Sequence, residues 1–139
     1  ARPLTCYLPV KDANFDLKQH IESAGHVLDA CANDIHVTDK MCSGWLLKRG
    51  EKRKTWKRRW FVLDRKEKTM SYNRTKDDKK HLKRVYFQTI EEVYVDHLRT
   101  VKSVKTKERL FYLVAPSAET MRIWIDAIFT GAEGYQEFQ

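Results

Sequence analysis

A chain of 139 residues with 42% hydrophobic residues has the size of one domain with a short extension, and it can bury a core. It lacks the run of about 18 apolar residues that a membrane-spanning helix needs, and residues 1–3 do not resemble the start of a signal peptide. Its cysteines are odd in number and lack metal-ligand spacing, so we expect reduced cytoplasmic thiols and no metal site: Cys6, Cys31 and Cys42.

The net charge of +8 is concentrated in one segment of the chain. Residues 48–84 hold 17 Lys and Arg against 5 Asp and Glu, whereas the rest of the chain is slightly acidic. Such segregation is typical of a surface that meets anions, either phosphoinositide headgroups, nucleic acid or an acidic protein. A solvated basic face that serves only solubility would give the same pattern, so charge alone does not decide between them.

Residues 1–40 have the pattern of an N-terminal extension. A proline-flanked apolar patch comes first, and Asp16 then begins a short helical pattern that Gly25 ends. Residues 33–40 are polar enough to be a connector. The extension carries too many apolar side chains to leave exposed, so we expect it to pack on the domain. These side chains are Tyr7, Leu8, Phe15, Leu17 and Ile21.

From residue 42 onward the pattern changes to short strands separated by polar turns. A basic loop at 49–55 follows the first strand, and a second charged loop lies at 74–81. The expected strands are 44–48, 56–64, 69–73, 83–88, 90–95 and 109–115.

Successive side chains of the predicted strand 56–64 point to opposite faces of the sheet. Lys57 and Arg59 lie on one face together with Phe61. Arg58 and Trp60 lie on the other, where we expect Arg58 to meet solvent or an acidic neighbour and Trp60 to enter the core.

A helical pattern replaces the strands after residue 116. Ser117 suits the N-cap, Glu119 suits the first turn, and Gly131 is the natural stop. The apolar residues between them form one stripe: Met121, Trp124, Ile125, Ile128 and Phe129. The expected fold is mainly β with one C-terminal α-helix, a bent antiparallel barrel or sandwich that the helix caps, with Trp124 as its largest buried anchor.

Two segments carry a family resemblance. Residues 44–50 (GWLLKRG) and 54–63 (KTWKRRWFVL) resemble the opening strands of a pleckstrin homology (PH) domain, and Trp124 resembles the tryptophan of that family's closing helix. The resemblance implies three parts: an N-terminal extension at 1–40, a PH domain at 41–131 and a C-terminal tail at 132–139.

Shorter stretches are similar to the C-terminal region of the pleckstrin homology-like domain family B proteins. This narrower resemblance implies a cytoplasmic protein, peripheral at the plasma membrane and cell cortex, whose domain recruits a large scaffold with cytoskeletal or cortical partners. Between residues 96–98 and 104–106 the family usually has a longer connection and an additional strand. Only a few residues connect them here, so the sequence does not decide whether the sixth strand forms. The similar stretches are 2–5, 7–10, 15–17, 20–26, 86–88, 90–94, 114–117, 121–124 and 130–135.

The lipid-binding motif of PH domains maps onto this chain residue by residue. It asks for a Lys near the end of the first strand and then a basic residue, any residue and Arg on the second, which are Lys48, Lys57 and Arg59. Gly50 would let loop amides approach a phosphate, and Tyr72 has either a phosphate contact or a packing role. The predicted phosphoinositide-binding residues are Lys48, Arg49, Lys52, Lys54, Lys57, Arg59 and Tyr72.

The resemblance also implies a preference for 3-phosphorylated lipids, either phosphatidylinositol 3,4,5-trisphosphate or the 3,4-bisphosphate. Further cations form a diffuse patch that attracts an anionic membrane surface without selectivity: Lys76, Lys79, Lys80, Lys83 and Arg84.

Three other functions are nucleic-acid binding, catalysis and protein interaction. No nucleic-acid motif appears, so we expect no nucleic-acid partner. No catalytic motif or cofactor-binding loop appears either, so we expect neither an enzyme nor a cofactor. The alternative that stays open is a PH-like protein-interaction domain with only diffuse attraction to anionic lipid. The intact basic triad Lys48, Lys57 and Arg59 argues against that alternative.

Overall fold

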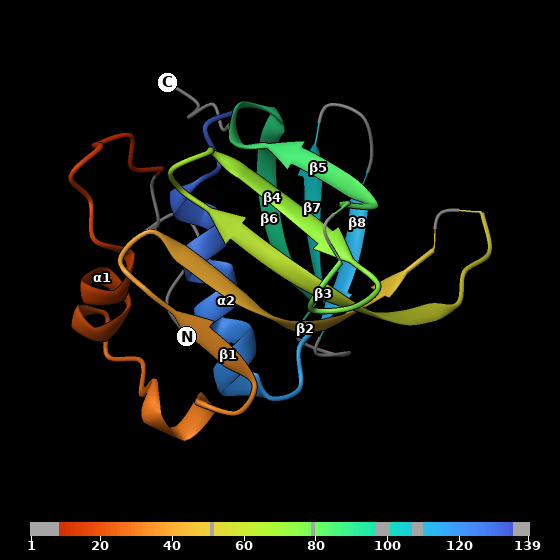
Figure 1. Cartoon of the computed structure of the whole chain (residues 1–139), viewed down its shortest axis with the longest axis horizontal. Helices are drawn as coiled ribbons and strands as arrows, with labels where there is room; N and C mark the ends of the chain where they lie inside the picture. The colour runs from red at the N-terminus through yellow and green to blue at the C-terminus, as the bar shows by residue number, and fades with distance from the viewer. Residues whose placement is uncertain (1–8, 51, 79, 97–100, 107–109, 135–139) are drawn as a thin grey trace.

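The computed structural model describes residues 9–50, 52–78, 80–96, 101–106 and 110–134. In these residues it has eight strands, two α-helices and two short 3-10 turns (Figure 1). The strands are β1 (Ile35–Val37), β2 (Met41–Arg49), β3 (Trp56–Asp64), β4 (Thr69–Asn73), β5 (Lys83–Tyr86), β6 (Ile90–Asp96), β7 (Val101–Thr106) and β8 (Leu110–Val114). The helices are α1 (Leu17–Ser23) and α2 (Ala118–Thr130). Neither is long and apolar enough to cross a bilayer.

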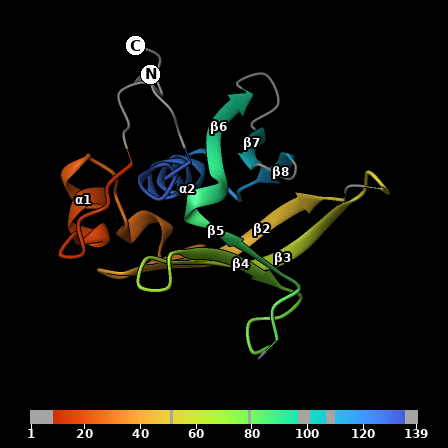
Figure 2. The same ribbon diagram turned by 90° about the horizontal axis from the view of Figure 1, so that it is seen from above.

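The strands form one antiparallel sheet in the order β5-β4-β3-β2-β8-β7-β6. The sheet bends so that β2 to β5 make one layer and β6 to β8 the other, and α2 lies across the open side (Figure 2). This arrangement confirms the predicted fold, a bent antiparallel barrel capped by a C-terminal helix. A sheet that curls in this way buries one face of each layer, so alternate residues of every strand enter one shared core.

The core lies between the two layers and the helix. Leu46 and Phe61 come from the first layer, Phe111 and Leu113 come from the second, and all four are buried. Trp124 closes the space from α2 and has no exposed surface, as its place in the apolar stripe predicts. Each such side chain stabilises the fold by about 1.5–3 kcal/mol through burial.

The ends of α2 have the predicted chemistry. The Ser117 hydroxyl accepts a hydrogen bond from the Thr120 backbone N–H at 3.1 Å, which satisfies one orphan donor of the first turn. Gly131 follows the last turn, where an added Cβ would lie 2.9 Å from the Phe87 ring. Close packing of a buried aromatic against the helix end therefore requires glycine at this position.

Three strands differ from the expectation. The strand expected at 83–88 ends at Tyr86, where the 3-10 turn Phe87–Thr89 follows. β1 forms inside the segment 33–40, which its polarity had suggested as a connector. β1 pairs with the first half of β2, and β8 pairs with the second half along the same edge. β1 therefore covers backbone groups of β2 that β8 leaves unpaired. β7 supplies the sixth strand that the short connection had left open, and it pairs with both β6 and β8.

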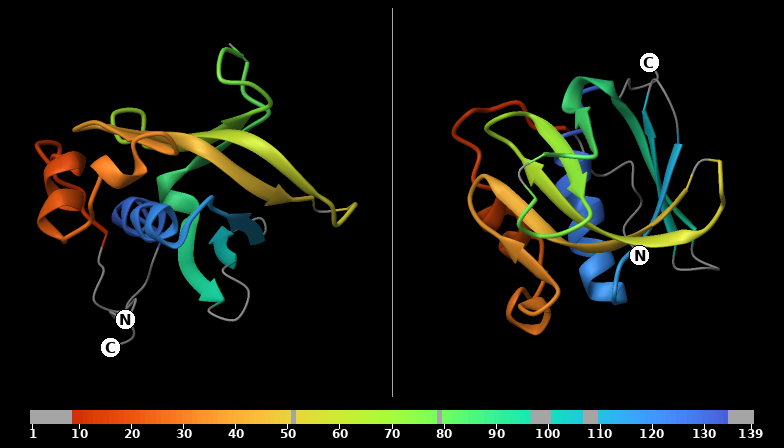
Figure 3. Two further views of the ribbon diagram at one scale, coloured as in Figure 1. Left: turned by 90° about the horizontal axis from the view of Figure 1, so that it is seen from below. Right: turned by 45° about the vertical axis from the view of Figure 1, so that its right-hand side comes forward.

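The N-terminal segment, which the structure describes from residue 9, lies beside α2 and the end of β3 (Figure 3). The Val10 backbone N–H donates to the Thr130 carbonyl at 2.9 Å, and Leu17 and Ile21 of α1 are buried in the common core. Asp16 caps α1 by accepting from the Gln19 N–H. Two of the apolar side chains expected to pack here, Tyr7 and Leu8, lie outside the described residues.

Candidate anion-binding site

The β2–β3 hairpin brings three cations to one face of the sheet. Its register sets Lys48 opposite Lys57 and Leu46 opposite Arg59, and directly opposite residues of an antiparallel pair share a face. Leu46 is buried on this face, whereas Lys57 is exposed and Arg59 is half-exposed. The apolar interior of the barrel therefore ends in a cationic rim at the base of the hairpin, which extends away from α2 (Figure 3).

Aromatic rings surround the ammonium group of Lys48. Its Nζ lies 5.0 Å from the centroid of the Tyr72 ring and 5.8 Å from that of the Phe111 ring. Both distances allow cation–π attraction. Tyr72 also packs on Phe61, with ring centroids 5.2 Å apart, so it supports the core and the cationic rim together.

Sequence reasoning placed Lys83 in the diffuse patch, but the register gives it a different position. Lys83 lies opposite Tyr72 on β5, and therefore on the same face as Lys48 and Arg59. Strand parity could have found it, because Lys83 alternates in phase with the buried Val85. Lys76, Lys80 and Arg84 are exposed, and Lys79 lies outside the described residues.

The hairpin loop carries further cations on a tight turn. The Gly50 N–H donates to the Thr55 carbonyl at 2.9 Å, and a Cβ at residue 50 would collide with the Arg53 carbonyl. Glycine is therefore needed to close the loop, and its own N–H is already used inside it. Lys52 and Lys54 are exposed on this loop.

Arg49 is not brought together with the other site residues. It lies opposite Trp56, on the outer face of the sheet, where its guanidinium stands 4.8 Å from the centroid of the Tyr112 ring. Trp56 on the same face is 42% exposed.

The outer face of β2 and β3 is an aromatic–cation stack, so the expectation that Trp60 enters the core was wrong. Trp60 packs edge-on against Trp45 with ring centroids 5.3 Å apart, and both are only partly buried. The guanidinium of Arg58 covers Trp45 at 4.0 Å, and Lys76 covers Trp60 at 5.3 Å. The physical reason is parity: Phe61 takes the core-facing position, so its neighbour Trp60 must face outward.

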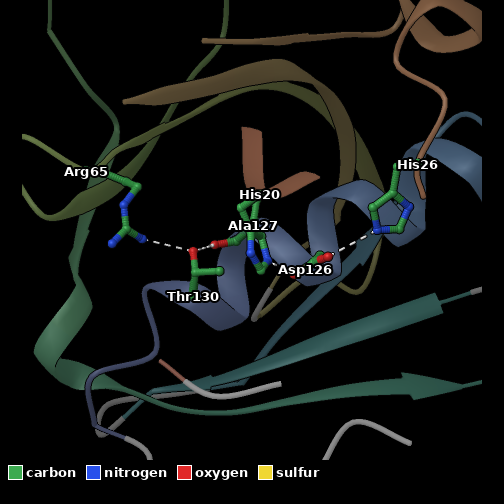
Figure 4. A network of polar contacts seen from close by, with 6 residues as sticks. All are labelled: His20, His26, Arg65, Asp126, Ala127 and Thr130. Carbon is green, nitrogen blue, oxygen red and sulfur yellow. Dashed lines mark hydrogen bonds and ion pairs between the residues drawn. The ribbon is translucent and has the colours of Figure 1, made fainter. Parts of the chain in front are cut away.

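A second polar cluster joins the N-terminal segment to α2 (Figure 4). The carboxylate of the buried Asp126 meets His20 Nε2 at 2.8 Å and His26 Nε2 at 3.1 Å. Burial by itself would raise the pKa of Asp126, but hydrogen bonds from His26 and His20 and their charges outweigh it and lower the pKa below its usual value. Sequence reasoning missed this cluster, because its partners are about 100 residues apart.

The remaining metal-binding and redox side chains give no further site within the described ranges. Cys31 and Cys42 are buried free thiols, and Cys6 lies outside those ranges. No group of three or more His, Cys, Asp or Glu residues in the described part of the chain could hold a metal ion.

Comparison with known proteins identifies the fold and its family. A family model described as "PH domain" matches residues 40–132. The chain is 34% identical over 97 residues to pleckstrin homology domain-containing family A member 2 of Homo sapiens. The matched region covers 62% of this chain and 22% of that protein. The match therefore spans about a fifth of that relative.

Two solved structures show the same fold. The carboxyl-terminal PH domain of pleckstrin superposes with a TM-score of 0.59 at 24% identity, covering 65% of this chain and 93% of that one. The C-terminal PH domain of pleckstrin in complex with D-myo-Ins(1,2,3,5,6)P5 gives a TM-score of 0.58 at 25% identity, covering 65% and 92%.

Proposed function

Since this chain belongs to the PH domain family, we propose that it is a membrane-targeting module whose cationic rim binds the headgroup of a phosphoinositide. The observation that carries this proposal is the β2–β3 register, which puts Lys48, Lys57 and Arg59 on one face at the mouth of the barrel. Lys52 and Lys54 on the loop, and Tyr72 and Lys83 on the neighbouring strands, extend the rim.

The residue types suit a phosphorylated inositol ring. The planar guanidinium of Arg59 can give two parallel hydrogen bonds to one phosphate, whereas Lys48 and Lys57 act as compact point charges. Phosphates at two or three ring positions can then meet separate cations. The pleckstrin domain solved with an inositol pentakisphosphate supports this class of ligand for a fold of this kind.

The proposal includes a preference for 3-phosphorylated lipids and the recruitment of a larger cortical scaffold protein. The preference rests on the basic loop after Lys48 together with the complete triad. The recruitment rests on the resemblance of the short motifs to the family B proteins. On this view the outward-facing cations, such as Lys76 and Arg84, add attraction to an anionic leaflet without selecting among headgroups.

Vesicle co-sedimentation with each phosphoinositide, at about 150 mM salt, tests the proposal. The test variant is Lys57→Ala/Arg59→Ala. The matched control is Arg58→Ala/Lys66→Ala, which removes the same charge from the outer face and from the β3–β4 turn. A phosphate contact from a cation contributes about 1.5–3 kcal/mol, so the loss of two such contacts should weaken binding at least about a hundredfold. The control should lose only a few-fold.

Two results would count against the proposal at different levels. Equal loss in the test and control variants would leave only diffuse attraction and would favour a protein partner. Selective loss in the test variant, with no preference for a 3-phosphate in headgroup competition, would keep the membrane module and reject its proposed specificity.

A further inference from the structure

A pocket lies at the end of the barrel opposite the β2–β3 hairpin. Its volume is about 480 Å³, and it is formed by residues 10–13, by Arg65, Lys66 and Lys68 of the β3–β4 turn, and by Lys40, Phe87 and Glu133. Figure 1 shows the N-terminal segment (red) beside the β3–β4 turn on the left and the tip of the β2–β3 hairpin (yellow) on the right. Nine residues of β3 separate the two ends, or roughly 30 Å at about 3.3 Å per residue.

Five cations and two carboxylates line this pocket: Lys11, Lys40, Arg65, Lys66 and Lys68 against Asp12 and Glu133. Arg65 donates to the Val10 carbonyl at 2.6 Å and to the Thr130 hydroxyl at 2.9 Å. Lys40 donates to the Ala13 carbonyl at 2.9 Å. These acceptors are neutral, so they fix the two cations in place without cancelling their charge.

The half-buried guanidinium of Arg65 is only partly used. It packs over the Phe15 ring at 4.4 Å, and two of its five N–H donors are engaged within the described residues. Burial lowers the pKa of Arg65, and the nearby charge of Glu133 opposes that effect. An ion pair at the rim, between Lys68 Nζ and Glu133 Oε2, is loose at 3.8 Å.

Lys68 has an unusual backbone for a lysine. Its φ is 56°, in the left-handed region that glycine adopts at lower cost, and it is the one non-glycine residue with positive φ among the described residues. The turn is held by Asp64 Oδ1, which accepts from the N–H groups of Lys66 and Glu67 at 3.0 and 3.1 Å. Strained residues of this kind concentrate at functional sites, and this one sets a cation at the pocket rim.

We propose that this pocket binds an acidic peptide segment of a partner protein, with carboxylates on the lysine rim and an apolar side chain against Val10 and Ala13. The excess of cations selects an anion, and the apolar lining favours a peptide over a bare polyphosphate. The tip of the β2–β3 hairpin and the pocket lie at opposite ends of β3, so a bilayer that contacts the tip leaves the pocket available to another ligand. Residues 10–13 lie outside the family match at 40–132, so the pocket combines the domain with its N-terminal segment.

Fluorescence anisotropy with a fluorescein-labelled peptide of alternating glutamate and leucine tests this proposal, with a glutamine–leucine peptide as the neutral probe. The variant Lys66→Gln/Lys68→Gly should bind the acidic peptide about tenfold more weakly than the unchanged chain. Glycine at residue 68 removes the left-handed strain, so the variant should melt at the same temperature or higher. Weaker binding therefore cannot be attributed to unfolding.

The matched control is Lys52→Gln/Lys54→Gln, which removes two charges from the hairpin loop instead. It should weaken vesicle binding and leave peptide binding unchanged, so failure of the headgroup site and failure of the pocket are distinguishable. Equal loss of peptide binding in both variants, or equal binding of the acidic and neutral peptides, overturns the proposal. The amide signals of Lys11 and Lys66 in NMR spectra distinguish two classes of ligand. If inositol hexakisphosphate shifts these signals and the acidic peptide does not, the pocket binds polyphosphates and the proposed peptide ligand is wrong.

Discussion

Replacing Asp126 with alanine tests whether the histidine–aspartate cluster holds the N-terminal segment on α2. Asp126 has no exposed surface, and its two carboxylate oxygens accept from His20 and His26. An ionised carboxylate can only accept hydrogen bonds, so both Nε2 atoms must carry a hydrogen. Alanine would remove both bonds and leave two ring donors facing a methyl group.

The expected loss can be worked out from the geometry. A hydrogen bond to a charged group contributes about 1.5–3 kcal/mol, so two such bonds set an upper value of about 3–6 kcal/mol. The side chain of His20 is 32% exposed, so water can replace part of its bond, whereas His26 is 14% exposed and has less access to water. We therefore expect the free energy of unfolding to fall by about 2–4 kcal/mol. For a chain of this length the melting temperature should fall by roughly 6–16 °C.

Thermal unfolding followed by circular dichroism at neutral pH measures this loss. Asp126→Asn is the shape-matched variant, and it should lose about half as much, because its amide keeps one acceptor oxygen but turns a donor toward the second ring. The triple variant with His20→Ala and His26→Ala gives the coupling between the partners. A coupling near zero, or a loss below about 1 kcal/mol in Asp126→Ala, would refute the reasoning.

Three further predictions concern Asp126, the N-terminal segment and the contact between β1 and β2. The pKa of Asp126 lies below its usual value, so its contribution to stability is present above a pH of about 4 and is lost as the pH falls through the lowered pKa. The difference in melting temperature between Asp126→Asn and the unchanged chain should therefore shrink in acid. Removing residues 1–40 takes Leu17 and Ile21 out of the core, which should lower the melting temperature by roughly 10–20 °C, and an unchanged value would show that the segment does not pack on the domain. Gly44→Ala would put a Cβ 2.6 Å from the Asp34 carbonyl, so calorimetry should show a loss of about 1–3 kcal/mol unless β1 moves away from β2.

Elements with strong local signals could be predicted closely from the sequence. The bounds of β3 and β4 match the expected strands, because alternation is unbroken and charged turns flank it. The limits of α2 match as well, since Ser117 suits an N-cap and Gly131 suits the position after the last turn, on either side of an apolar stripe of helical period. The cationic triad was also predictable, because strand parity and pairing of consecutive strands are enough to put its members on one face.

Features that depend on distant partners could not be predicted in this way. β1 is three residues long and is a strand only because the edge of β2 is open beside it. The outward position of Trp60 depends on which face of β3 the helix covers, and composition does not reveal that. The buried position of Asp126 has no local signal in the sequence, because the two histidines that hydrogen-bond its carboxylate come from a segment about 100 residues earlier.

The two proposed sites should work independently, and that independence can be tested. If Lys57 and Arg59 rest on lipid phosphates, Arg65 of the pocket lies roughly 26 and 20 Å from them at about 3.3 Å per residue. At about 150 mM salt the Debye length is about 8 Å, so charge at one site is screened from the other across water. The acidic peptide should therefore bind with the same affinity to the free chain and to the chain already held on phosphoinositide vesicles, as measured by anisotropy with and without vesicles. Competition between peptide and vesicles would mean that one cationic surface binds both ligands. The proposal of two separate sites at opposite ends of β3 would then be wrong.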